Sequence, residues 1–160
     1  MKFKIIILIS ILLCLVGLNA ENNNALINKQ VKIIDGDTIH LNGNKYRLYG
    51  IDAPEIKQEC EVNQKSYRCG LQSKNFLESI VKGKQIQCKQ KDVDQYKRIV
   101  AICFVNGLDI NQKMVKSGWA IAYRYYSMDY VEDELLAKNN QLGIWKGTFT
   151  KPKDWRRENR

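Results

Sequence analysis

Short runs in which hydrophobic residues alternate with polar ones predict five β-strands in this chain. The last of them is the richest in β-branched residues, which favour strands. Asn42-Gly43-Asn44 is typical of a tight turn between the second and third runs, and Asn106-Gly107 follows the fifth. The runs span residues 30–34, 38–41, 45–51, 84–89 and 97–105.

Three segments have the hydrophobic spacing of helices, and they span residues 70–83, 109–116 and 129–141. Gly83 suits a left-handed cap at the end of the first, and Gly118 stops the second. Asp129 and Glu132 stand in capping-box positions at the start of the third. Three strands, a helix, two strands and two helices, without strict strand–helix alternation, predict an α+β domain around a small antiparallel barrel.

The N-terminus has the pattern of a secretory signal. Lys2 and Lys4 precede an apolar run at 5–18, which is short for a membrane-spanning helix, and Ala20 ends a plausible cleavage site. We expect cleavage after Ala20 and a secreted or periplasmic protein. Because Leu18 occupies a position where small residues are usual, an uncleaved N-terminal membrane anchor stays open as the alternative.

The expected organisation is therefore a signal peptide at 1–20, a flexible polar lead-in at 21–28, one folded domain at 29–147 and a basic C-terminal tail at 148–160. A total of 160 residues fits a single domain. For the tail, which carries Trp155, Arg156 and Arg157, two roles stay open: packing back on the domain, or contacting an anionic ligand.

Composition narrows the class of protein further. A hydrophobic fraction of 44% with three Trp and eight Tyr supports a packed core and excludes wholesale disorder. The formal charge is +9, and loss of residues 1–20 removes two lysines and no acid, which leaves +7. Such a surplus suits an anionic partner such as nucleic acid, but also simple solubility, so charge alone does not decide.

Four cysteines follow the signal, and an even count in an exported chain favours two disulfides, with three possible connectivities. Cys60 and Cys69 share one polar segment, while Cys88 and Cys103 stand in two strand-like runs. We therefore predict disulfides 60–69 and 88–103. The chain has no C-x-x-C spacing and a lone His40, which makes a structural zinc site improbable.

Candidate chemistry is concentrated in short motifs. An Asp-Gly-Asp-Thr stretch at 35–38 is by itself typical of a turn, in which we expect Asp35 to act as a cap. Farther along, Arg47 stands on a strand, and Asp52 and Glu55 flank the point where that strand ends. Carboxylates and guanidiniums in combination can neutralise a phosphodiester and activate water against it.

In their order, four motifs resemble the staphylococcal nuclease (thermonuclease) family. They are Asp35-Gly36-Asp37-Thr38, Arg47-Leu48, Gly50-Ile51-Asp52-Ala53-Pro54-Glu55 and Asp94-Gln95-Tyr96-Lys97-Arg98. Stretches at 118–123 and 143–145 extend the resemblance over about 31–145. The cysteine placement resembles the exported bacterial branch of that family, in agreement with the pairing predicted above.

The resemblance implies an OB-fold β-barrel, five-stranded here, with about three packed α-helices. It also implies a Ca²⁺-dependent phosphodiesterase that cuts DNA and RNA with little sequence preference and leaves 3′-phosphate and 5′-hydroxyl ends. It implies no protein partner, and a monomer is the default. Oxygen ligands suit a hard cation such as Ca²⁺.

Carried over by position, Asp37 and Asp52 match the metal-binding carboxylates and Ala53 matches the residue that lends its backbone carbonyl. Glu55 matches the carboxylate that positions or deprotonates the attacking water. The other matches are the phosphate-gripping Arg47 and Arg98 and the nucleotide-contacting Tyr96, Tyr123 and Tyr125.

Several alternatives stay open at this stage. Arg47 and Glu55 can form a structural ion pair instead, and Tyr123 and Tyr125 can be core or rim residues. Lys97 stands where the family usually has glycine, so the turn before Arg98 can differ. Residues 56–68 are polar and are expected to be mobile apart from their disulfide.

Two other classes of protein remain. One is an OB-fold module that binds single-stranded nucleic acid without cutting it. The other is a disulfide-stapled interaction module whose basic surface holds an anionic polymer. The full set of acids and arginines favours the nuclease.

Overall fold

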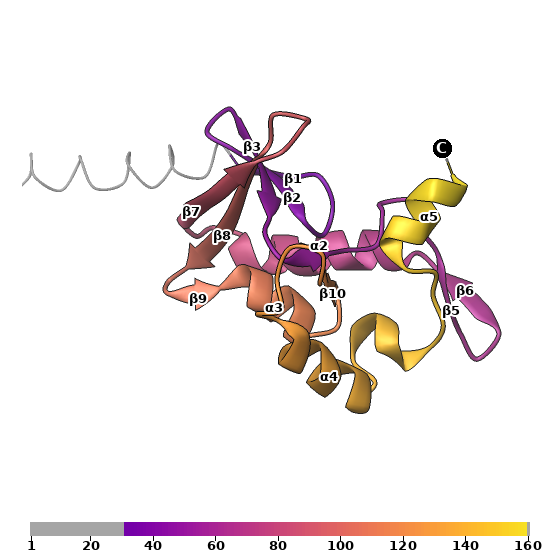
Figure 1. Ribbon diagram of the computed structural model, residues 1–160. Helices are drawn as coiled ribbons and strands as arrows, with labels where there is room; N and C mark the ends of the chain where they lie inside the picture. The colour runs from indigo at the N-terminus through magenta and orange to yellow at the C-terminus, as the bar shows by residue number, and fades with distance from the viewer. Residues whose placement is uncertain (1–30, 160) are drawn as a thin grey trace, which may run out of the picture. The chain divides into compact units, whose positions relative to one another are not determined.

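The computed structural model describes residues 31–159 (Figure 1). The expected signal peptide, its cleavage site and the lead-in lie outside these residues. In the part that is described, no helix has the length and apolar character needed to cross a membrane.

A twisted sheet forms the centre of the domain. Its order is β1-β2-β3-β8-β7, with β9 on the far part of β8, and only the β3–β8 pair is parallel. The strands are β1 (Val31–Ile33), β2 (Thr38–Leu41), β3 (Asn44–Leu48), β7 (Ile86–Val93), β8 (Ile99–Val105) and β9 (Leu108–Asp109). Asn42 and Gly43 both have positive φ, which confirms the predicted tight turn between β2 and β3.

The mixed α+β class is confirmed, but the predicted barrel is not closed in residues 31–159. β1 pairs with β2 alone and β7 with β8 alone, so the two ends of the sheet are not joined. The predicted strand at 45–51 is also divided. Gly50 has a φ of +74° and turns the chain into β4 (Ile51–Asp52), which pairs with β10 (Ile121–Ala122) in a separate ladder.

Two helices pack against the sheet, α2 (Cys69–Val81) and α3 (Ile110–Lys116), and α4 (Val131–Asn139) packs on α3 and β10. They enclose a core in which Ile39, Leu77 and Met114 are fully buried. The predicted capping box of α4 is wrong. The helix begins at Val131, so Tyr130 is its N-cap, without a side-chain cap, and Asp129 lies one residue before the cap. Three acids in the first turn favour that helix end through the helix dipole.

Both predicted disulfides are present. Cys60–Cys69 ties a short hairpin, β5 (Cys60–Val62) and β6 (Lys65–Tyr67), to the first residue of α2. Cys88–Cys103 joins residues directly opposite each other on β7 and β8. The segment at 56–68, expected to be mobile apart from its disulfide, thus contains this hairpin, and its mobility stays a prediction.

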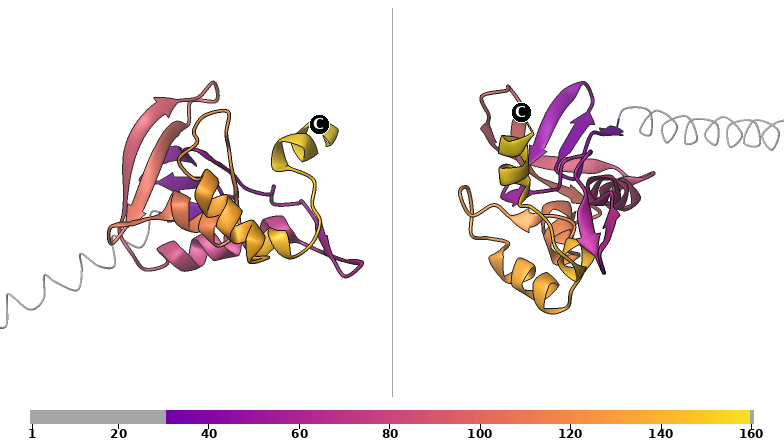
Figure 2. Two further views of the ribbon diagram at one scale, coloured as in Figure 1. Left: turned by 60° about the horizontal axis from the view of Figure 1, so that its bottom comes forward. Right: turned by 90° about the vertical axis from the view of Figure 1, so that its right-hand side faces the viewer.

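The segment predicted as a basic tail contains a helix, α5 (Pro152–Glu158), preceded by the 3₁₀ turn η1 (Gly143–Lys146). Glu61 and Thr148 exchange two 2.9 Å backbone hydrogen bonds, which fix the connection to the β5–β6 hairpin. Figures 1 and 2 show α5 standing apart from α4, although the two helices are close in sequence. Three residues of α5 line a pocket: Lys153, Arg156 and Arg157.

Candidate active site

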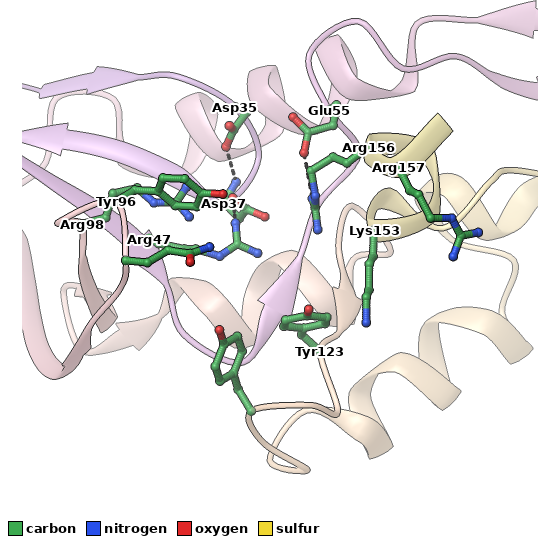
Figure 3. A pocket seen from close by; sticks show the side chains of 12 residues that line it. Asp35, Asp37, Arg47, Glu55, Tyr96, Arg98, Tyr123, Lys153, Arg156 and Arg157 are labelled. Atoms are coloured by element: carbon green, nitrogen blue, oxygen red, sulfur yellow. Dashed lines mark hydrogen bonds and ion pairs between the residues drawn. The ribbon is translucent and has the colours of Figure 1, made fainter. Parts of the chain in front are cut away.

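One pocket of about 620 Å³ collects the predicted motifs (Figure 3). It lies where the loop before β2, the ends of β3 and β4, the β7–β8 turn and α5 meet. Its lining consists of charged residues, one glutamine and three tyrosines. The lining residues are Asp35, Asp37, Arg47, Glu55, Gln95, Tyr96, Arg98, Tyr123, Tyr126, Lys153, Arg156 and Arg157.

Asp37 is held at the pocket floor with 3% of its surface exposed. Its Oδ1 accepts hydrogen bonds from Arg47 Nη1 at 2.6 Å and from the Thr38 hydroxyl at 3.0 Å, and its Oδ2 accepts from the Ala53 N–H at 3.0 Å. Burial works to raise the pKa of Asp37, but Arg47 and these hydrogen bonds outweigh it and lower that pKa. Asp37 is therefore a carboxylate at neutral pH.

Asp35 has the turn-capping role expected from sequence, because its Oδ1 accepts from the N–H of Asp37 at 2.9 Å. It also lines the pocket. Burial, and then the charges of Asp37 and Glu55, raise its pKa to about 7. The Asp35 carboxyl is therefore easier to protonate than an exposed one, mainly because it is buried.

Arg47 joins the two predicted metal-binding carboxylates. Nη1 donates to Asp37, and Nη2 donates to Asp52 Oδ1 at 3.0 Å and to the Ile51 carbonyl at 3.3 Å. Burial alone lowers the pKa of Arg47, but the two carboxylates outweigh it, so the guanidinium stays charged. These contacts use both terminal nitrogens of the guanidinium.

Asp52 is fully buried, directly under the pocket. Burial and then the neighbouring charge of Asp37 raise its pKa, against the lowering effects of Arg156 and Arg47. Ala53 is buried beside it and contributes its N–H to Asp37. The predicted metal-binding residues are thus brought together.

Glu55 faces a partner that sequence reasoning did not assign. Arg156 Nη1 donates to Glu55 Oε1 at 2.7 Å and to Asp52 Oδ1 at 3.0 Å, and Nη2 donates to Asp52 Oδ2 at 3.1 Å. The alternative of an Arg47–Glu55 ion pair is wrong, since Arg47 pairs with Asp37 and Asp52 instead. The basic tail was recognised in the sequence, but nothing in the sequence indicated that Arg156 would meet a residue 101 positions away.

A close approach of two segments places Glu55. Gly70 lies in the first turn of α2, and a Cβ there would fall 1.7 Å from the Glu55 carbonyl oxygen. The N–H of Glu55 donates to Gln58 Oε1 at 3.2 Å, and Gln58 is itself fully buried. Glycine at position 70 therefore allows the Glu55 backbone to pack against α2.

Hydrogen bonds to Asp94, within the turn between β7 and β8, orient the Arg98 side chain. Asp94 Oδ2 accepts from Arg98 Nε at 2.7 Å, and Asp94 Oδ1 accepts from the N–H groups of Tyr96 and Arg98, both at 2.9 Å. Lys97 takes a φ of +61°, the left-handed conformation that glycine adopts most readily. Lysine thus keeps the geometry that glycine would give, and Arg98 lines the pocket.

Of the three tyrosines predicted to contact nucleotides, two line the pocket and one does not. Tyr96 and Tyr123 line the pocket, and the Tyr96 ring lies 5.5 Å from the Arg98 guanidinium carbon. Tyr125 is outside the lining and is 77% exposed, whereas Tyr126, which was not predicted, lines it. The rings of Tyr125 and Tyr123 lie 5.1 and 5.2 Å from that of Tyr126, so the three tyrosines form one aromatic cluster beside the pocket.

The donor set fits a hard cation by its chemistry, because buried carboxylate oxygens and a backbone carbonyl are the ligands such ions prefer. Asp37, Asp52 and Ala53 would hold it. Within residues 31–159 no group of three or more acidic, histidine or cysteine side chains is placed to chelate an ion. The charges now facing Asp37 and Asp52 are those of Arg47 and Arg156.

Comparison with known proteins identifies relatives of the whole domain. The model of a family described as staphylococcal nuclease homologue matches residues 45–147. An uncharacterized endonuclease of Haemophilus influenzae is 35% identical over 96% of this chain and 85% of its own length. A micrococcal nuclease of Shigella flexneri is 31% identical over 79% of this chain and 78% of its own. The succinoglycan biosynthesis protein ExoI of Rhizobium meliloti is 34% identical over 73% of this chain and 63% of its own.

An OB-fold that gathers buried carboxylates and arginines in one polar pocket defines a nucleic-acid-cleaving enzyme, an endonuclease. More specifically, the chain belongs to the staphylococcal nuclease family.

Proposed function

We propose that the protein is an exported, Ca²⁺-dependent endonuclease that hydrolyses phosphodiester bonds of DNA and RNA and leaves 3′-phosphate and 5′-hydroxyl ends. The observation that carries the proposal is the convergence of Asp37, Asp52, Arg47, Arg98 and Glu55 on one pocket. We propose that the protein acts as a monomer.

The residues divide the chemistry between them. Two guanidiniums, Arg47 and Arg98, bind the phosphate oxygens on which negative charge builds, and they stabilise it in a partly buried site. Glu55 takes the proton of the attacking water. A cation held by Asp37 and Asp52 supplies further positive charge next to the phosphate.

Two tyrosines of the pocket give a physical reason for low sequence preference in the proposed enzyme. Tyr96 and Tyr123 offer ring faces at the pocket, and every base has a face that can stack on them. Stacking does not read base edges, so it accepts DNA and RNA alike.

Cleavage of single-stranded DNA and RNA by residues 21–160, with Ca²⁺ and with chelator, tests the proposal. We expect calcium-dependent cutting that falls at least about a hundredfold in Glu55→Gln, because a general base contributes about 10² to 10⁴ in rate. Glu78→Gln, on the exposed face of α2, is the matched control and should cut normally. End-labelling should find a 5′-hydroxyl and a 3′-phosphate.

DNA that binds tightly but stays intact with every cation tried would overturn the nuclease and favour a binding module. Mass spectrometry of the protein recovered from the culture medium or periplasm tests export, with Glu21 as the expected N-terminus. An intact chain in the membrane fraction would show an N-terminal anchor instead. Light scattering should give the mass of a monomer.

A further inference from the structure

The C-terminal helix α5 supplies three cationic residues to the pocket. Lys153, Arg156 and Arg157 line it together with Arg47 and Arg98. Figure 3 shows the α5 residues on one side of the pocket and Arg47 and Arg98 on the other. The family match ends at residue 147, so it does not assign this helix.

We propose that α5 forms the second wall of the nucleic-acid groove and that Arg156 is a substrate-binding residue, a third phosphate ligand beside Arg47 and Arg98. This inference rests on the proposed function. It places the strand between the α5 wall and the side of the pocket that carries Arg47 and Arg98.

Geometry supports the assignment of Arg156. Its guanidinium makes a two-point contact with both oxygens of Asp52, at 3.0 and 3.1 Å, and a third contact with Glu55 at 2.7 Å. This planar fork is the arrangement with which arginine binds phosphate. The side chain keeps 32% of its surface exposed, so its charge reaches the open pocket.

The two other cationic residues of α5 also contribute to this wall. The Lys153 ammonium lies 6.0 Å from the centre of the Tyr125 ring, which links α5 to the aromatic cluster. Arg157 pairs with Asp154 at 3.3 Å and keeps 73% of its side chain exposed. Cations together with aromatic rings are the features of surfaces that bind single-stranded nucleic acid.

An uncharged contact also holds the segment that leads into α5. Gln58 Nε2 donates a 2.6 Å hydrogen bond to the Thr150 carbonyl, two residues before the helix begins. Because Gln58 also binds the N–H of Glu55, one buried side chain sets both Glu55 and the start of α5.

A second consequence concerns the cation. Arg156 donates to both Asp52 oxygens, so a cation that binds Asp52 shares those oxygens with a guanidinium. Arg156 therefore opposes cation binding in the free protein. Replacing Arg156 with an uncharged residue should therefore lower the affinity for nucleic acid and raise the affinity for Ca²⁺.

The test compares residues 21–160 as wild type, Arg156→Gln, Arg156→Lys and Lys82→Gln. The last removes one exposed charge at the end of α2, outside the pocket lining. Binding of a fluorescent phosphorothioate oligonucleotide in Ca²⁺ is followed by anisotropy over a range of salt. Calorimetry measures Ca²⁺ affinity without nucleic acid. Near-UV circular dichroism checks that each variant is folded.

We expect Arg156→Gln to weaken oligonucleotide binding about ten- to hundredfold, as for loss of a charge-assisted two-point contact. Its salt slope should fall by about 0.7, the value for one phosphate contact on a single strand. Arg156→Lys should restore the slope but only part of the affinity. Lys82→Gln should change neither, and Ca²⁺ should bind Arg156→Gln more tightly than wild type.

Unchanged oligonucleotide affinity in a folded Arg156→Gln variant would overturn the proposal, and faster cleavage with unchanged affinity would show that Arg156 only blocks the site. These outcomes differ from a failure of the proposed function, in which the wild type itself does not cut. In that case the same binding comparison still decides whether Arg156 holds nucleic acid.

Discussion

The buried side-chain amide of Gln58 donates a 2.6 Å hydrogen bond to the backbone carbonyl of Thr150, 92 residues farther along the chain. Its oxygen accepts from the N–H of Glu55 at 3.2 Å. The carbonyl of Gln58 in turn accepts from the Gly70 N–H at 3.2 Å. Gln58, which has no proposed catalytic role, thus connects three parts of the structure. They are Glu55 (the candidate general base), the first turn of α2 and the segment that leads into α5.

Replacing Gln58 with alanine should therefore destabilise the protein and impair the site together. The change leaves the Glu55 N–H and the Thr150 carbonyl without their partner and opens a cavity, which we expect to cost about 2–4 kcal/mol in free energy of unfolding. Urea denaturation measures that loss. Cleavage assayed well below the unfolding transition should also be slower, because Glu55 and α5 lose their common anchor. Normal cleavage in the folded variant would contradict this positioning role.

Lys97 offers a stability test in the opposite direction. Its φ of +61° is unfavourable for a residue with a Cβ, and the turn is closed by the Lys97 N–H donating to the Asp94 carbonyl at 2.9 Å. Lys97→Gly should raise the free energy of unfolding by about 0.5–1 kcal/mol. Lys97→Ala loses the same charge but keeps the strained backbone, so it should give no gain. Equal stability of the two variants would show that charge, not backbone conformation, matters here.

Asp94 should make stability depend on pH. Burial works to raise its pKa, but the hydrogen bonds from the backbone and side chain of Arg98 outweigh burial and lower the pKa below the ordinary 3.8. A carboxyl with a lowered folded-state pKa stabilises the fold above about pH 4, and that contribution disappears as pH falls through the lowered value.

The expected result is that Asp94→Asn loses about 1–3 kcal/mol at pH 7, the range for hydrogen bonds to a charged group. The gap between wild type and variant should shrink toward pH 3. Urea unfolding at pH 7, 5, 4 and 3 measures it, and Asp92→Asn on exposed β7 controls for the loss of one acid. A gap that stays constant down to pH 3 would contradict the role of the Asp94 charge.

Sequence predicted the fold best where an element carries its own pattern. The alternation in β2 and β8 and the Asn-Gly turn after β2 are local signals, and those elements were found close to their observed bounds. The β5–β6 hairpin was missed because its residues are mostly polar and exposed, and the Cys60–Cys69 bond and the backbone pairing with Thr148 hold it instead. Long-range contacts of that kind leave no periodicity in a sequence.

The site shows the same division. Asp37, Arg47, Asp52 and Glu55 are close in sequence, and their motifs predicted one cluster. Arg156 stands in a segment with visible charge but no motif, so its charge was noted and its partners were not. Tyr126 was missed for a different reason: three tyrosines occur within four residues, and spacing alone does not tell which rings face the pocket.

Gly36, between the two acids of the first motif, gives the most direct test of how the site is shaped. A Cβ at this position would lie 2.0 Å from the Ser73 hydroxyl oxygen and 2.7 Å from the Ala53 Cβ, so the loop before β2 packs directly on α2. Gly36→Ala should therefore cost about 1–3 kcal/mol in stability by overpacking, and should displace Asp37 from the Ala53 N–H.

A double-mutant cycle locates the cause. Ser73→Gly removes the nearest obstructing atoms but leaves Ala53, so the pair Gly36→Ala with Ser73→Gly should lose less than the sum of the two single changes. Calcium titration followed by calorimetry should show weaker binding in Gly36→Ala and partial recovery in the double variant. Strict additivity of the two losses would mean that the loop relaxes away from α2 and that Gly36 does not set the position of Asp37.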